Sequence, residues 1–295
     1  MAGSQTLPER LADCTMAIVG LGLMGGSLAL ALRGRCRRLL GIDPDSATLT
    51  LAEKMYLADE LEPRSEDLLE QADLIVLAAP VQVILSLLGE LPNLHSGPAI
   101  VLDLGSTKAQ ICAAMDALPE RFEAVGGHPM GGKERSSLQE AQAEVYREAP
   151  FALVRTRRST PRACRLAEEL AFAADARPLW LDADTHDRWT AATSHLPCLV
   201  ANALAAITPV EAAPMVGPGF RSTTRVAVTP TNVILDVLQT NRDNVLARLH
   251  DLRNRLALIE GLLEDERYTE LVDALLEGAS HYQALVEKER VARQP

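Results

Sequence analysis

A serine and a histidine at the ends of two expected strands are the side chains of this chain best placed for acid–base chemistry. Ser106 lies in the segment DLGSTK and His128 in the segment GGHPM, and each segment follows an apolar run. The carboxyl ends of strands in open α/β sheets line the crevice where ligands bind. Ser106 and His128 would therefore face a bound ligand, and an imidazole in such a place suits proton transfer.

A glycine motif near the N-terminus predicts a dinucleotide site. Gly20, Gly22 and Gly25 follow an expected strand and open an expected helix, which is the context that this motif requires. The first glycine allows a tight turn, the second lets a pyrophosphate approach the backbone, and the third lets the helix pack on the sheet. The helix N-terminus would then face the phosphates. The residues between the glycines belong to the same predicted site: Leu21, Leu23 and Met24.

An acid downstream of the glycine motif indicates which dinucleotide binds. Asp43 ends the second expected strand, 23 residues after Gly20, where a carboxylate can accept hydrogen bonds from the adenosine ribose and would repel a 2′-phosphate. We therefore expect NAD rather than NADP, bound also by residues that follow the next two strands: Ala79, Pro80 and Gly105. A glycine turn without a ligand is the alternative, but the strand, helix and acid all coincide here.

Short apolar runs alternate with amphipathic stretches over the first part of the chain. The expected strands are 16–19, 39–42, 74–78, 100–104, 124–126, 151–154 and 179–181. The expected helices are 25–32, 47–55, 66–71, 81–88, 109–118 and 162–174. Continuous apolar strands alternating with helices are typical of a parallel sheet covered on both faces. We predict a Rossmann-type, doubly wound α/β domain over residues 1–182.

The strand pattern stops after residue 182, and the rest of the chain predicts an all-helical domain over residues 183–295. Residues 185–207 form one expected long helix, three prolines mark a loop over 209–218, and apolar residues recur at helical spacing from residue 231. This domain contains the segments SHLPC, with His195, and GFRSTTR, with Arg221 and Arg225. Its wide apolar faces predict a homodimer formed through the helical domain.

Composition excludes several other classes of protein. The net charge of −11 argues against nucleic-acid binding. The five cysteines form no CxxC pair, which favours reduced thiols over a disulfide framework or a zinc site, so we expect no metal. The N-terminus has no apolar signal segment and no apolar run reaches the roughly 20 residues that span a bilayer. We expect a cytoplasmic protein without membrane partners.

Five ordered motifs resemble the prephenate/arogenate dehydrogenase family of tyrosine biosynthesis. They are GLGLMGGSLA, DLGSTK, GGHPM, SHLP and GFRSTTR, and they extend from Thr15 to the helical tail. The resemblance implies NAD-dependent oxidative decarboxylation of prephenate to 4-hydroxyphenylpyruvate, CO₂ and NADH. Hydride would leave the carbon that bears the 4-hydroxyl, and the ring would lose its carboxylate as it becomes aromatic.

The resemblance also implies roles for individual residues. His128 would be the catalytic histidine that accepts a hydrogen bond or proton from the 4-hydroxyl, and Ser106 would hold that hydroxyl in register. Arg225 would pair with a substrate carboxylate, Arg221 is a weaker candidate for the same task, and His195 would meet the substrate from the helical side.

Some of these residues have simpler structural interpretations. Ser106 could cap the helix that begins near Lys108, and Lys108 itself would be a structural ion-pair partner. His195 lies in an apolar helix and could be a core histidine, and Arg221 could be purely structural. The remaining histidines are expected on the surface: His95, His186, His250 and His281.

Departures from the family pattern bear on the substrate. Many members carry a second histidine where Cys198 stands, and some carry an aspartate where Ser222 stands. Lys133 and a low count of acids in the pocket favour prephenate, a keto acid, over arogenate, which carries an ammonium group. The competing functions are an arogenate dehydrogenase, a β-hydroxyacid dehydrogenase and a non-catalytic NAD-binding dimer. Residues 185–207 lack the lysine that a β-hydroxyacid dehydrogenase needs there.

Overall fold

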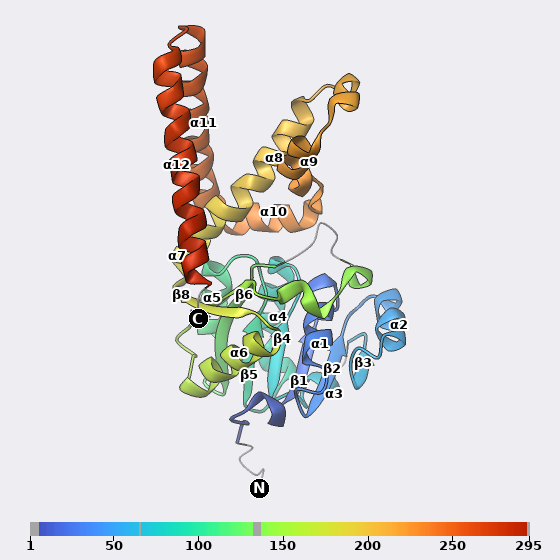
Figure 1. The fold of residues 1–295 in the computed structure, drawn as a ribbon. Coiled ribbons are helices and arrows are strands. Elements are labelled where there is room, and N and C mark those ends of the chain that lie inside the picture. Colours follow the sequence, from blue (N-terminus) through green and yellow to red (C-terminus); the bar gives the residue numbers. More distant parts are fainter. Residues whose placement is uncertain (1–5, 65, 132–136, 294–295) are drawn as a thin grey trace. The chain divides into compact units, whose positions relative to one another are not determined.

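The computed structural model describes residues 6–64, 66–131 and 137–293, and a single eight-stranded sheet organises its first part (Figure 1). The strand order is β3-β2-β1-β4-β5-β6-β7-β8. The strands are β1 Thr15–Val19, β2 Arg38–Ile42, β3 Glu60–Glu62, β4 Leu74–Leu77, β5 Ala99–Asp103, β6 Phe122–Pro129, β7 Pro150–Arg155 and β8 Arg177–Leu181. The predicted doubly wound sheet is confirmed, because chain order reverses direction between β1 and β4.

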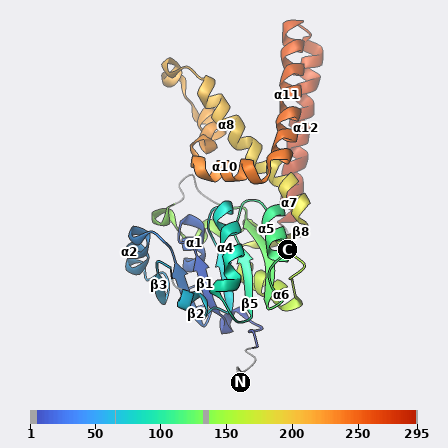
Figure 2. The same cartoon turned by 180° about the vertical axis from the view of Figure 1, so that it is seen from behind.

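Helices cover both faces of the sheet and enclose two separate cores (Figures 1 and 2). The helices of this part are α1 Leu23–Leu32, α2 Ser46–Lys54, α3 Glu66–Leu69, α4 Val81–Leu94, α5 Ala109–Asp116 and α6 Pro161–Ala173. Side chains of α1 and α6 pack with Met16 and Ile18 of β1 in one core, while those of α4 and α5 pack with Ala17 in the other. Because successive strand residues point to opposite faces, a strand buried on both sides must be apolar throughout.

Two details of the sheet differ from the expectation. The edge strand β3 was not predicted, since its sequence Glu60-Leu61-Glu62 contains one apolar residue and no β-branched one. Strand β7 pairs with β6 in the antiparallel direction, whereas the other pairs are parallel. An apolar run alone does not encode the direction of a strand, so this exception could not be predicted from periodicity.

The helical region begins with one continuous helical run. Helix α7 (Ala183–Thr190) passes through a π-helical turn, η4 (Ala191–His195), into α8 (Leu196–Ile207). The predicted helix over 185–207 is confirmed, although the π turn within it was not foreseen. The proline-rich segment that was expected to be a loop contains short helices: η5 Val210–Met215, α9 Pro218–Thr224 and η6 Arg225–Val228. Helix α10 (Thr231–Thr240) follows.

The run Ala183–Ile207 is, within the described ranges, the one helix long and apolar enough to cross a bilayer. It nevertheless contains four buried polar side chains, His186, Asp187, Thr190 and His195. Asp187 accepts hydrogen bonds from the backbone of α5, and His186 contacts His128 of β6. We therefore interpret the run as a helix that packs on the sheet region of a folded protein.

The chain divides into two compact units, residues 1–245 and 246–295. The second unit is a helical hairpin made of most of α11 (Arg242–Glu264) and of α12 (Tyr268–Ala292). Arg255 links its two helices by a hydrogen bond to Glu277, at 2.9 Å, and by another to the carbonyl of Ala274. Large apolar side chains stay exposed on this hairpin: Leu256, Leu258, Leu263, Val272, Leu275, Leu276 and Leu285.

Candidate active site

The glycine turn between β1 and α1 has the close packing that a dinucleotide site requires. Gly20 has a φ of +97°, and a Cβ atom there would lie 2.5 Å from the carbonyl oxygen of Ala78. A Cβ atom on Gly25 would lie 1.9 Å from the carbonyl oxygen of Gly20. Because Gly22, the N-cap of α1, has no side chain, it leaves the first N–H groups of the helix open to an anion. These features fit a bound pyrophosphate.

Asp43 lies beside this turn. One oxygen of its carboxylate accepts the N–H of Leu21 at 2.7 Å, and the other accepts the N–H of Asp45 at 2.9 Å. Each carboxylate oxygen can accept more than one hydrogen bond, so lone pairs stay available for ribose hydroxyls. The loop Ala78–Pro80 follows β4 on the other side of the switch point, next to the glycine turn.

A buried ion pair connects the loop that carries Ser106 to the strand that carries His128. Lys108 and Asp103 are both fully buried, and the ammonium group of Lys108 contacts the carboxylate of Asp103. The same carboxylate accepts the N–H of Gly105 at 2.7 Å and the N–H of Gly127 at 3.0 Å. Asp103 thus fixes the ends of β5 and β6 relative to each other, and Lys108 has the structural role expected for it.

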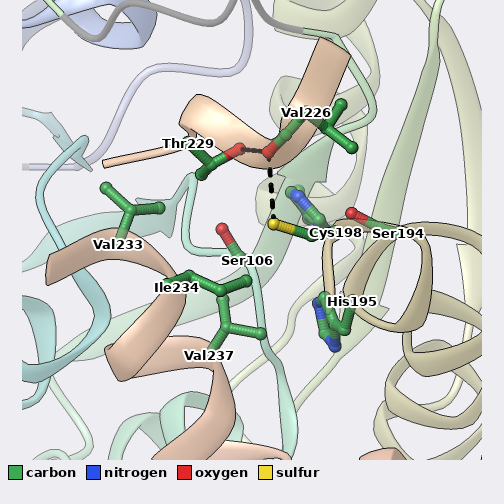
Figure 3. Close-up of a pocket in the computed structure, with 10 residues that line it drawn as sticks. Ser106, Ser194, His195, Cys198, Val226, Thr229, Val233, Ile234 and Val237 are labelled. Atoms are coloured by element: carbon green, nitrogen blue, oxygen red, sulfur yellow. Dashed lines mark hydrogen bonds between the residues drawn. The ribbon is translucent and has the colours of Figure 1, made fainter. Parts of the chain in front are cut away.

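A pocket of about 130 Å³ lies where these loops meet the helical region (Figure 3). It is lined by Ser106, His128, Ser194, His195, Cys198, Val226, Thr229, Val233, Ile234 and Val237. The sheet provides Ser106 and His128, the π turn and α8 provide the next three residues, and η6, Thr229 and α10 close the far side. Cavities of similar size, ~150 Å³, accept a single six-membered ring.

His128 is connected to two further polar side chains behind the pocket. Its Nδ1 lies 2.9 Å from Nε2 of His186, and Nδ1 of His186 lies 2.7 Å from Oδ1 of Asp187. Asp187 also accepts the backbone N–H groups of Lys108 and Ala109, at 2.7 and 2.9 Å. Burial alone would raise the pKa of Asp187, but the hydrogen bonds from His186 and from these backbone groups lower it by more. The net pKa of Asp187 is therefore below its usual value, and the carboxylate stays ionised.

His195 presents a hydrogen-bond donor at the pocket. The side-chain nitrogen of Asn241 lies 2.7 Å from the carbonyl oxygen of Asp187 and 3.2 Å from Nδ1 of His195. Because that amide nitrogen is a donor, Nδ1 of His195 accepts, and Nε2 carries the hydrogen in the neutral ring. Nε2 is buried and has no hydrogen-bond partner among the residues that the structure describes. The simple interpretation of a satisfied core histidine therefore fails.

The pocket histidines are held in their neutral forms. The pKa of His128 lies well below 6.5, first because burial disfavours the charged ring and then because the neighbouring basic groups His186, Lys108 and His195 oppose a further positive charge. Burial likewise lowers the pKa of His195 to about 4, against an opposing effect of Asp187. A neutral His128 can accept a proton near neutral pH.

Three predicted substrate residues are not among those that line the pocket. Arg221 and Arg225 are exposed on α9 and η6, although Val226, the neighbour of Arg225, does line it. Lys133 lies outside the described residues. No pairing of Arg225 with the pocket is therefore assigned from the structure.

Two expectations about histidines and helix capping were wrong. His95 and His186 are buried rather than on the surface, because both rings have hydrogen-bond partners in the interior. Ser106 does not cap α5; the carboxylate of Asp187 accepts the N–H groups at that end instead. For His186 and for the start of α5 the error has one origin, since His128, the partner of His186, and Lys108, the partner of Asp187, lie more than 50 residues away in the sequence.

Family models cover most of the chain. Residues 28–178 match the model described as the prephenate dehydrogenase nucleotide-binding domain. Residues 182–277 match the model described as the prephenate dehydrogenase dimerization domain.

Curated relatives carry related names. The chain is 30% identical over 264 residues to the prephenate dehydrogenase of Bacillus subtilis, a match that covers 85% of this chain and 71% of the relative. It is 28% identical over 271 residues to a cyclohexadienyl dehydrogenase of Zymomonas mobilis, covering 83% of this chain and 89% of that protein.

Solved structures agree in fold. A prephenate dehydrogenase of Aquifex aeolicus, solved with hydroxyphenyl propionate and NAD+, has a TM-score of 0.84 at 26% identity and covers 92% of this chain and 98% of its own. An arogenate dehydrogenase of Synechocystis has a TM-score of 0.77 at 28% identity, with coverage of 92% and 99%.

Proposed function

The chain belongs to the prephenate dehydrogenase family, and we propose on that premise that it oxidises prephenate at the pocket of Ser106, His128 and His195. The product would be 4-hydroxyphenylpyruvate, with CO₂ and NADH, as in L-tyrosine biosynthesis. The observation that carries the proposal is that a neutral histidine, a serine and an apolar wall meet in one ring-sized cavity at the carboxyl ends of β5 and β6.

The chain's own residues would perform four tasks. The glycine turn, with Asp43, Ala79, Pro80 and Gly105, would hold the dinucleotide, which accepts a hydride when bound. Val233, Ile234 and Val237 would contact the ring and exclude water from it. Ser106 would hydrogen-bond the 4-hydroxyl and orient it. His195 would donate its Nε2–H to an oxygen of the substrate.

His128 would accept the proton of the 4-hydroxyl. As this O–H bond breaks, its electrons form the C=O bond and the hydride leaves the same carbon. The ring carboxylate then departs as CO₂, and its bonding electrons complete the aromatic ring while the oxygen regains a proton. A neutral acceptor is needed at the first stage, and the low pKa of His128 provides it.

Prephenate is favoured over arogenate by the character of the pocket. Among the described residues that line it there is no Asp or Glu, so the ammonium group of arogenate would find no carboxylate partner there. Arg225, and less strongly Arg221 and Lys133, would bind substrate carboxylates. Arogenate is the close alternative, because the family resemblance includes an arogenate dehydrogenase.

NAD is favoured over NADP by Asp43. Its carboxylate is held at the glycine turn by the N–H groups of Leu21 and Asp45, so it cannot easily move away from a 2′-phosphate. Like charges in contact would weaken NADP binding.

We also propose the larger organisation of the enzyme. A dinucleotide-binding domain over residues 1–182 and a helical substrate domain over 183–295 are supported by the two family models. A homodimer through the helical domain is supported by the exposed apolar side chains of α11 and α12. All five cysteines are free, which suits a reducing cytoplasm.

The test is a steady-state comparison of prephenate and arogenate, each with NAD and with NADP. We expect NADH formation to be fastest with prephenate and NAD. His128→Asn should lower kcat by roughly 10²–10⁴-fold, as for loss of a general base. Absence of NADH formation with both substrates would refute the function, and a fully active His128→Asn variant would refute the role of that residue.

A further inference from the structure

We propose that His186 and Asp187 are positioning residues that fix the proton of His128 on Nδ1, so that Nε2 is left as the base. This inference rests on the proposed role of His128. The three side chains form a continuous chain of hydrogen bonds, 2.9 Å from His128 to His186 and 2.7 Å from His186 to Asp187. Both inner residues are almost completely buried, at 1% and 2% exposure.

The direction of each hydrogen bond follows from the carboxylate. The ionised Asp187 can only accept, so Nδ1 of His186 must carry a hydrogen. When the ring of His186 carries only this hydrogen, its Nε2 is an acceptor. Nδ1 of His128 must therefore donate to it, and the neutral ring of His128 keeps a lone pair on Nε2. Without such a chain, both tautomers of His128 would be available.

The position of Asp187 is itself rigid. Its two oxygens accept backbone N–H groups at the start of α5, and its carbonyl oxygen accepts the amide of Asn241. The carboxylate therefore cannot rotate away from His186 without losing several hydrogen bonds in the interior.

The same chain would compensate charge during the reaction. When Nε2 of His128 takes the substrate proton, the ring becomes a cation next to the buried Lys108. The negative charge of Asp187 lies two hydrogen bonds away and opposes that cost, in the way a buried carboxylate supports a catalytic histidine in hydrolytic triads. His186 transmits this effect through its two hydrogen bonds.

Two variants of His186 distinguish a role in positioning His128 from a purely structural role in packing. In His186→Leu the partner of His128 Nδ1 is lost, and we expect kcat to fall by about 10²-fold with KM changed by less than about 3-fold. In His186→Gln the side-chain oxygen can accept the same N–H, and we expect kcat to recover to within about 10-fold of the original. Both variants should bind NAD as the original enzyme does, since the glycine turn is unchanged.

The tautomer is measured directly by ¹⁵N NMR of histidine-labelled enzyme, with His128→Asn used to assign the signal. We expect His128 to show a protonated Nδ1 and an unprotonated Nε2 in the original enzyme and in His186→Gln, and a mixture of tautomers in His186→Leu. A protonated Nε2 on neutral His128 in the original enzyme would overturn the proposal, as would unchanged kcat in His186→Leu. The NMR result does not depend on turnover, so it distinguishes a wrong proposal here from a wrong assignment of the reaction.

Discussion

Acidification should destabilise this protein through His195 in a predictable way. The pKa of the buried ring is about 4 in the folded protein, because burial disfavours its charged form, and about 6.5 in an unfolded chain. As the pH falls below about 6.5, the imidazole of His195 binds a proton in the unfolded state but not in the folded state. Stability is therefore lost progressively between about pH 6.5 and about pH 4.

The size of the effect follows from these two values. At about pH 5 the ring is almost fully protonated in the unfolded chain and about one-tenth protonated in the folded one. The difference in proton binding lowers the free energy of unfolding by about 2 kcal/mol relative to about pH 8. His128 adds to the loss with the same sign, since its pKa is also lowered.

The assay compares the original chain with His195→Gln, which removes the titrating ring. Urea unfolding at about pH 8 and about pH 5, at one fixed protein concentration, should show a smaller loss of stability in the variant by about 2 kcal/mol. His281 is exposed on α12, so His281→Gln serves as the matched control and should lose as much as the original. An equal loss in the original chain and in His195→Gln would refute the reasoning.

Three further substitutions test the cofactor site and its support. Asp43→Ala should lower the affinity for NAD by about 10–100-fold, as expected for loss of hydrogen bonds to a charged group, and should reduce the difference in affinity between NAD and NADP. Binding titrations with both dinucleotides measure these affinities. An unchanged ratio of the two affinities would show that the carboxylate does not contact the ribose. Gly25→Ala should abolish tight NAD binding, because its methyl group would lie 1.9 Å from the carbonyl oxygen of Gly20. Gly89→Ala is the control, because nothing lies within 4 Å of a methyl group there. It should leave NAD binding unchanged and raise the free energy of unfolding by about 0.5–1 kcal/mol. Lys108→Met should lower the free energy of unfolding by about 3–5 kcal/mol, because Asp103 would remain charged and buried without its partner. Denaturant unfolding measures this change, and a loss of less than about 1 kcal/mol would contradict the prediction.

The sheet could be predicted from the sequence because its signals are local. Each central strand is a short apolar run, and the spacing of Gly20, Gly22 and Gly25 encodes the turn that follows β1. The central strands and the dinucleotide-binding turn therefore follow from segments of fewer than ten residues. The direction of β7 depends on its pairing with β6, which no short segment records.

The support of the active site could not be predicted in the same way. His128 and Ser106 stand in recognisable segments at strand ends, whereas His186 and Asp187 occur among charged residues of a helix with a polar start. Their burial results from contacts with His128 and with the start of α5, far away in the sequence. A rule that assigns polar helical residues to the surface fails wherever segments far apart in the sequence supply one hydrogen-bond network.

The π-helical turn at Ala191–His195 has a consequence for the evolution of this enzyme. A π turn accommodates one residue more than an α-helical turn, and one residue corresponds to a rotation of about 100° along a helix. Deleting one residue within this turn would restore regular α-helical geometry, while the residues of α8 that follow, Cys198 among them, would keep the face that they present now. A one-residue deletion in a regular part of α7 or α8 would instead rotate the residues that follow by about 100°, so the π turn is the position at which this helix can change in length without rebuilding the pocket wall.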